Sequence, residues 1–83
     1  MKQDRLSKLR GKIERMDREL VQLLQERSAI SVEIGRAKRD AAIEIYDPSR
    51  EAILYRQMEQ SSAGPLPPAA LKAIFREIFS SSR

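Results

Sequence analysis

Apolar side chains recur every three or four positions along the first forty residues, which is the spacing of one face of an α-helix. Only one gap interrupts this stripe, and no proline precedes Pro48. Its members are Leu6, Leu9, Ile13, Met16, Leu20, Leu23, Ile30 and Ile34. The pattern therefore predicts one long helix over about residues 3–40.

Two shorter helices are predicted in the second half of the chain, after a connection at residues 41–46. Asp47 can cap a helix that begins at Pro48 and ends near residue 60. Residues 61–65 read as a loop by their composition, and a third helix is expected over about residues 67–82. The second helix is expected to bury Ile53, Leu54 and Met58, and the third carries Leu71, Ile74, Phe75, Ile78 and Phe79 on one face. The expected fold is all-α, with one domain over residues 1–83.

The first predicted helix is too long for a single copy of this chain to cover. At 1.5 Å per residue it measures roughly 55 Å, whereas a compact domain of this length is only about 30 Å across. A second copy lying along the apolar stripe would cover it. We therefore expect an intertwined helical homodimer.

The amino-acid composition limits the kinds of functional site that the chain can form. The 83 residues contain no cysteine and no histidine, which argues against a disulfide, a metal site or a cofactor held by such ligands. Sixteen basic residues oppose twelve acidic ones, and residues 1–40 carry the whole excess of +4, which suits an anionic partner. No signal-like or membrane-spanning apolar run occurs, so we expect a cytoplasmic protein with no membrane partner.

Two cations stand where the stripe calls for apolar residues. The four-residue step after Leu23 reaches Arg27, and the step after Ile34 reaches Lys38. They are about 16 Å apart along the helix axis, so their side chains could hold a small anion between them. Pairing with an internal Glu, or escape of the long side chains at the edge of the stripe, is the alternative interpretation.

Three further charged residues extend this hypothesis. Arg50 and Glu51, in the first turn of the second helix, could return beside the stripe and add an acidic wall, although such a pair is also common on solvated surfaces. Arg10 is about 25 Å from Arg27 on the same helix. It could reach such a pocket only in the partner of an antiparallel dimer, or else simply pair with Glu14.

Four blocks in register resemble the helical chorismate mutases, and the stretch IFREIFSSSR near the end also looks like theirs. The blocks are Leu9-Arg10-x-x-Ile13-x-x-x-Asp17, Leu23-Leu24-x-Glu26-Arg27, Val32-x-Ile34-Gly35-x-Ala37-Lys38 and Asp47-Pro48-x-Arg50-Glu51. The resemblance implies a dimer that rearranges chorismate to prephenate, with two sites that each draw residues from both chains. It implies no cofactor and no metal.

The same resemblance implies a role for each site residue. Arg10 from the partner chain and Arg27 would hold the two carboxylates of the substrate, and Lys38 would donate to its ether oxygen. Glu51 and the backbone near Asp47 would hold the ring hydroxyl. Arg50 and Ser82 would complete the wall of the site.

One departure from the family concerns the end of the chain. The family carries a Gln or Glu about one turn beyond Ser82, which donates a second hydrogen bond to the ether oxygen, whereas this sequence stops at Arg83. Either the site is incomplete or the chain was cut from a longer polypeptide, and the uncapped end at residues 80–83, in mid-helix, favours the cut. Similar domains are fused to prephenate dehydratase or to the synthase that starts the shikimate pathway, and the stretch IFREIFSSSR looks closer to the dehydratase fusions.

Other functions stay open on sequence grounds. An isochorismate-pyruvate lyase would use nearly the same clamp on an isomeric substrate. A basic helical dimer could bind nucleic acid, although only four aromatic residues are present and none interleaves with the basic positions. A purely structural coiled coil explains the stripe but leaves Arg27 and Lys38 unexplained.

Overall fold

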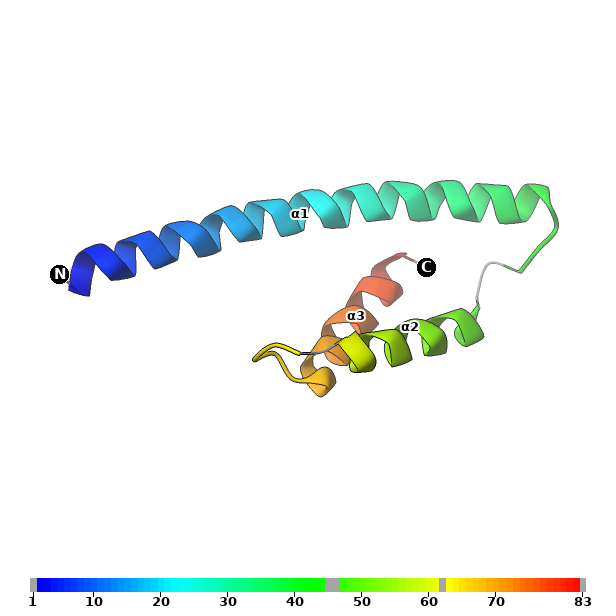
Figure 1. The fold of residues 1–83 in the computed structure, drawn as a ribbon. Helices are drawn as coiled ribbons and strands as arrows, with labels where there is room; N and C mark the ends of the chain where they lie inside the picture. Colours follow the sequence, from blue (N-terminus) through cyan, green and yellow to red (C-terminus); the bar gives the residue numbers. More distant parts are fainter. Residues whose placement is uncertain (1, 45–46, 62, 83) are drawn as a thin grey trace. The chain divides into compact units, whose positions relative to one another are not determined.

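The structure is a computed structural model that describes residues 2–44, 47–61 and 63–82. It contains α1 (Lys2–Asp40), α2 (Pro48–Ser61) and α3 (Pro68–Ser82), and no strand occurs in the described residues (Figure 1). Each helix differs from its expected bounds by one residue at one end. Parts of the expected connection at 41–46 and of the loop at 61–65, namely Ile45, Tyr46 and Ser62, lie outside the described residues. The chain divides within α1 into two units, residues 1–30 and 31–83.

The end of α1 is closed by backbone hydrogen bonds. The N–H of Ile43 donates to the carbonyl of Lys38 at 2.8 Å, and the N–H of Ala42 donates to the carbonyl of Arg39 at 3.1 Å. This pair of bonds is the Schellman motif, which requires one residue in the left-handed region. Ala42 occupies that position with φ 56°. A residue with a Cβ therefore adopts the conformation that glycine adopts most easily.

The starts of α2 and α3 follow their sequences. Asp47 Oδ1 accepts a hydrogen bond from the N–H of Arg50 at 3.1 Å, so Asp47 caps α2 and Pro48 is its first residue, as predicted. At α3 the carbonyl of Pro67 accepts the N–H groups of Ala70 and Leu71 at 3.0 and 3.1 Å. Each proline thus lies where its missing N–H costs no helical hydrogen bond.

Aromatic side chains and one ion pair join α2 to α3. The rings of Tyr55 and Phe79 meet edge to face with centroids 5.3 Å apart, and Phe75 lies 5.8 Å from Phe79. Lys72 and Glu59 form an ion pair between the same two helices. Phe79, with 5% of its surface exposed, is the buried apolar residue among those described. Because residue 59 pairs with 72 and residue 55 with 79, the two helices run antiparallel, and the start of α2 lies beside the end of α3.

The contact face of α2 differs in part from the expected one. Leu54 and Met58 are half-buried, but Ile53 is 53% exposed, so the prediction that Ile53 is buried is wrong for this chain. Tyr55 takes its place, because the ring of Phe79 packs against the side of α2 that Tyr55 occupies. On α3, Ile74 is 49% exposed, although it shares the predicted apolar face.

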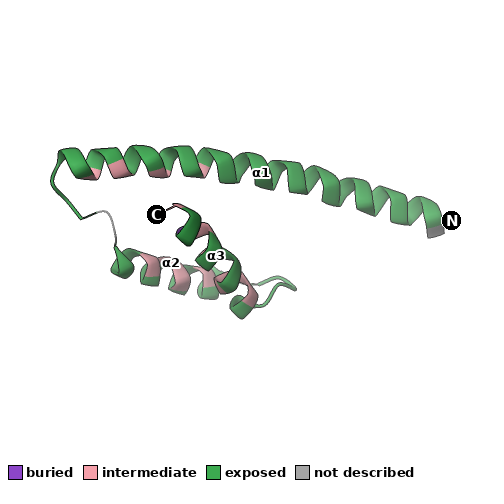
Figure 2. Ribbon diagram, turned by 180° about the vertical axis from the view of Figure 1, so that it is seen from behind, coloured by how far each residue is buried: buried purple, intermediate pink, exposed green. Residues whose placement is uncertain are grey.

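The apolar stripe of α1 is exposed in the single chain. Its side chains keep between 46% and 60% of their surface exposed, and Figure 2 shows α1 almost entirely in the exposed colour. An apolar stripe of this length is normally covered by another element. The second copy that was expected to cover the stripe stays a prediction.

Candidate functional site

One face of α1 is less exposed than the rest of the helix. Its half-buried side chains and glycine are Arg27, Ser31, Gly35 and Lys38, and all other described residues of α1 beyond Lys2 are exposed. Steps of four, four and three residues place these positions on one side of the helix, above one another. Two of them are the cations that interrupt the apolar stripe. Arg27 and Lys38 are thus two of the four half-buried positions in the described part of α1 beyond Lys2.

Ser31 and Gly35 were not among the predicted site residues, although Gly35 belongs to one of the blocks that carry the family resemblance. They lie between the two cations on the same face, one turn and two turns after Arg27. A Cβ added to Gly35 would meet no atom within 4 Å, so this glycine leaves open space beside the face. The signal that could have found both residues is the four-residue step from Arg27, since it reaches positions 31 and 35 before the step of three that reaches Lys38.

The first turn of α2 presents the next group of predicted residues. Glu51 is half-buried, whereas Asp47 and Arg50 are exposed. The carboxylate of Asp47 is engaged in capping the backbone of Arg50, and the N–H of Glu51 donates to the carbonyl of Asp47 at 3.3 Å. The cap therefore holds the backbone from which Arg50 and Glu51 project.

Ser82 lies in the last turn of α3 and is half-buried. Its hydroxyl donates a hydrogen bond to the carbonyl of Ile78 at 2.8 Å, and Ser81 donates to the same carbonyl at the same distance. A hydroxyl has one hydrogen to donate and two lone pairs. The hydroxyl hydrogen of Ser82 is therefore used within α3.

The ring contact between Tyr55 and Phe79 lies one helical turn from Glu51 on α2 and one turn from Ser82 on α3. Tyr55 is one helical turn after Glu51 on the same half-buried side of α2, and Phe79 is one turn before Ser82 on α3. The first turn of α2 and the last turn of α3 are therefore held at the same end of the helix pair. The predicted site residues at this end are Asp47, Arg50 and Glu51 at the start of α2 and Ser82 at the end of α3. Of these, Glu51 and Ser82 are half-buried.

Arg10 is exposed on α1 and lies seventeen residues before Arg27. A helix rises 1.5 Å per residue, so the two Cα atoms are about 25 Å apart along the same helix. The two guanidinium groups of one chain cannot contact the same small molecule. A shared role for them requires a second copy.

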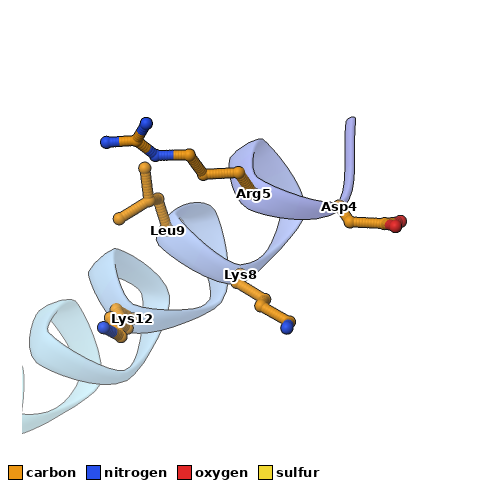
Figure 3. Close-up of a pocket in the computed structure, with 5 residues that line it drawn as sticks. All are labelled: Asp4, Arg5, Lys8, Leu9 and Lys12. Carbon is orange, nitrogen blue, oxygen red and sulfur yellow. The ribbon is translucent and has the colours of Figure 1, made fainter. Parts of the chain in front are cut away.

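A shallow hollow on the N-terminal turns of α1 contains none of the predicted site residues. It is lined by Asp4, Arg5, Lys8, Leu9 and Lys12, as Figure 3 shows. All five residues are exposed and belong to one helix, so the hollow has no opposing wall of its own.

Two kinds of feature are absent from the described residues. No cluster of three or more acidic residues there is arranged to hold a metal ion. No described helix is long and apolar enough to cross a membrane.

The described residues form a three-helix, all-α protein with two half-buried cations on one face of α1. Residues 9–83 match the family described as chorismate mutase type II, and this match covers most of the chain. The chain belongs to the chorismate mutase type II family.

Relatives with this domain are found in bacteria and archaea. The chain is 35% identical over 81 residues to the bifunctional chorismate mutase/prephenate dehydratase of Aquifex aeolicus, with 93% of this chain and 22% of that protein covered. The Pseudomonas aeruginosa protein of the same name is 34% identical over 84 residues, covering 95% and 23%. The chain thus spans about a fifth of the length of these relatives. A Methanocaldococcus jannaschii chorismate mutase is 28% identical over 57 residues, covering 69% of this chain and 58% of that one.

A solved structure agrees with the fold over nearly the whole chain. Form I of chorismate mutase from Thermus thermophilus superposes with a TM-score of 0.91 at 34% sequence identity. The superposition covers 95% of this chain and 99% of that one. The three-helix all-α fold is therefore the fold of a solved family member.

Proposed function

We propose that this chain is a chorismate mutase, which converts chorismate to prephenate by a pericyclic rearrangement. The observation that carries the proposal is the half-buried position of Arg27 and Lys38 on one face of α1, in a chain that belongs to the chorismate mutase type II family. A guanidinium and an ammonium on one helix face carry the charges that can bind the carboxylates of a small dicarboxylate.

The reaction requires little from the protein beyond position and charge. One carbon–oxygen bond of the ether breaks while one carbon–carbon bond forms within the same molecule, so no nucleophile, base or metal takes part. Arginine forks can hold the two carboxylates and keep the flexible side arm over the ring. An ammonium placed in advance can stabilise the negative charge that grows on the ether oxygen.

The proposed roles follow that division of work. Arg27 holds a carboxylate and the ammonium of Lys38 donates to the ether oxygen. Glu51 accepts a hydrogen bond from the ring hydroxyl, with the backbone near Asp47 beside it. Arg50 and Ser82 complete the wall. The antiparallel packing of α2 and α3 supports this assignment, because it holds the turns of Glu51 and Ser82 at one end of the pair.

A homodimer with shared sites is part of the proposal. The exposed stripe of α1 supports it, since burying this stripe against a second copy would contribute about 25 cal/mol for each Å² of apolar surface removed from water. Arg10 of the partner would then supply the second carboxylate clamp, which one chain cannot do because of the separation along α1.

The names of the bifunctional relatives support one further partner. A prephenate dehydratase carried on the same polypeptide would consume the proposed product directly. We propose it on that similarity. A full-length reading frame that continues into a different domain would contradict it.

The direct test is to incubate the purified chain with chorismate, follow the loss of substrate absorbance in the ultraviolet, and identify the product by chromatography. Prephenate is expected, and Arg27→Ala should abolish most of its formation. Release of pyruvate from isochorismate, without prephenate from chorismate, would instead identify a lyase. No turnover of either chorismate or isochorismate would contradict the proposal.

A further inference from the structure

Ser31 lies between Arg27 and Lys38 on the half-buried face of α1. Its Cα atom is about 6 Å beyond that of Arg27 along the helix axis and about 10 Å before that of Lys38. At 100° per residue, the three positions fall within about 40° of one another around the helix. A small molecule held between the two cations would therefore lie against Ser31.

The hydroxyl of Ser31 has no hydrogen-bond partner within the described part of the chain. The hydroxyls of Ser81 and Ser82 differ, because both donate to the carbonyl of Ile78 at 2.8 Å. A bond of that kind, to a carbonyl three or four residues earlier, is the usual use of a serine hydroxyl inside a helix. Ser31 is half-buried and does not make it, so its hydroxyl keeps a hydrogen that it can donate to a ligand.

Gly35 leaves the hydroxyl of Ser31 uncovered. In an α-helix each Cα–Cβ bond tilts toward the N-terminus, so a side chain at residue 35 would extend over residue 31, one turn earlier. Glycine has no such side chain, and a Cβ added there would meet no atom within 4 Å. A ligand that approaches this face of α1 therefore reaches Ser31 directly.

We propose that Ser31 is a further substrate-binding residue, whose hydroxyl donates a hydrogen bond to the carboxylate that Arg27 holds. This inference rests on the proposed function and deepens it by adding a neutral donor beside the two cations. A carboxylate presents about four lone-pair sites on its two oxygens, and a guanidinium fork occupies only part of them. Ser31 is one helical turn from Arg27, so its hydroxyl is placed to use another of these sites.

The atom that accepts this hydrogen bond determines which kinetic constant the bond affects. The carboxylate keeps its charge during the rearrangement and is present in both chorismate and prephenate. A bond to it is therefore similar in substrate, transition state and product, and such uniform binding lowers KM without raising kcat. The ether oxygen is different, because its negative charge grows only as the carbon–oxygen bond breaks. A donor to the ether oxygen would act on kcat.

The test compares the steady-state kinetics of four proteins with chorismate as substrate. Ser31→Ala removes the hydroxyl and keeps a good helix former. We expect its KM to rise about 10-fold, as for the loss of one hydrogen bond to a charged group, with kcat within about twofold of the parent. Inhibition by added prephenate should weaken by the same factor. Ser31→Thr keeps the hydroxyl and should retain the KM of the parent. The matched control is Ser28→Ala, which removes an exposed hydroxyl from the same helix and should change neither constant.

The outcomes separate this inference from the proposed function. Turnover by the parent, with the same KM in Ser31→Ala, would overturn the inference alone. A lower kcat at unchanged KM would assign the hydroxyl to the ether oxygen and also overturn it. An equal rise in KM for Ser31→Ala and Ser31→Thr would show that the hydroxyl does not bind the substrate. A parent that turns over no chorismate would contradict the proposed function, and this inference with it.

Discussion

Replacing Ala42 by glycine should stabilise the protein, because this alanine closes α1 in a left-handed conformation. Ala42 has φ 56° and its Cβ is exposed, so glycine would lose little buried surface there. An L-residue with a Cβ pays about 1 to 2 kcal/mol to adopt that region. Glycine avoids this strain but loses about 0.5 to 1 kcal/mol through its more flexible unfolded state.

The difference predicts a gain of about 0.5 to 1 kcal/mol for Ala42→Gly. Thermal unfolding followed by circular dichroism should show a Tm higher by about 2 to 8 °C, at a protein concentration kept equal for parent and variant. The matched control is Ala41→Gly, one residue earlier, where the N–H still donates to the carbonyl of Ala37 in the helical manner and φ is not positive. This control should be destabilised. Equal destabilisation of both variants would refute the assignment of strain to Ala42.

Two further predictions concern the proposed site. Lys38→Ala should lower kcat about 100- to 1000-fold, or about 2.7 to 4 kcal/mol, while the dimer stays folded by circular dichroism and sedimentation; an unfolded variant would make Lys38 structural instead. Tyr55→Leu should raise KM as well as lower stability by about 1 kcal/mol, since it removes the edge-to-face contact with Phe79 that holds the turns of Glu51 and Ser82. The control Phe75→Leu removes the other ring contact of Phe79, so it should lower stability similarly and leave KM unchanged. Equal KM values for the two variants would show that Tyr55 contributes to packing and does not position the site.

The helices were predictable because each carries a local signal. The period of the apolar stripe defined α1, and the pair Asp47-Pro48 marked the start of α2 through a cap that the structure contains. The face of α2 was less predictable. Ile53 and Tyr55 are both apolar enough to be buried, and only the position of Phe79 on another helix decides between them.

The candidate site was predictable only in its charged members. Arg27 and Lys38 interrupt an apolar pattern, so the sequence marks them, and both are half-buried. Ser31 and Gly35 share the same face, but a serine or a glycine in a helix carries no charge that would mark it. The role proposed for Arg10 could not be predicted from the pattern of one helix. It depends on a second chain, and the pattern does not reveal where that chain lies.

The measurement that tests the account most directly is complementation between Arg10→Ala and Arg27→Ala. Each variant alone should be nearly inactive, since both sites of its dimer lack one carboxylate clamp. In an equal mixture half of the dimers are mixed, and one of the two sites in each is intact, so about a quarter of the parent's rate of prephenate formation should return. A mixture no more active than its components, with mixed dimers shown by native mass spectrometry, would contradict a site shared between two copies.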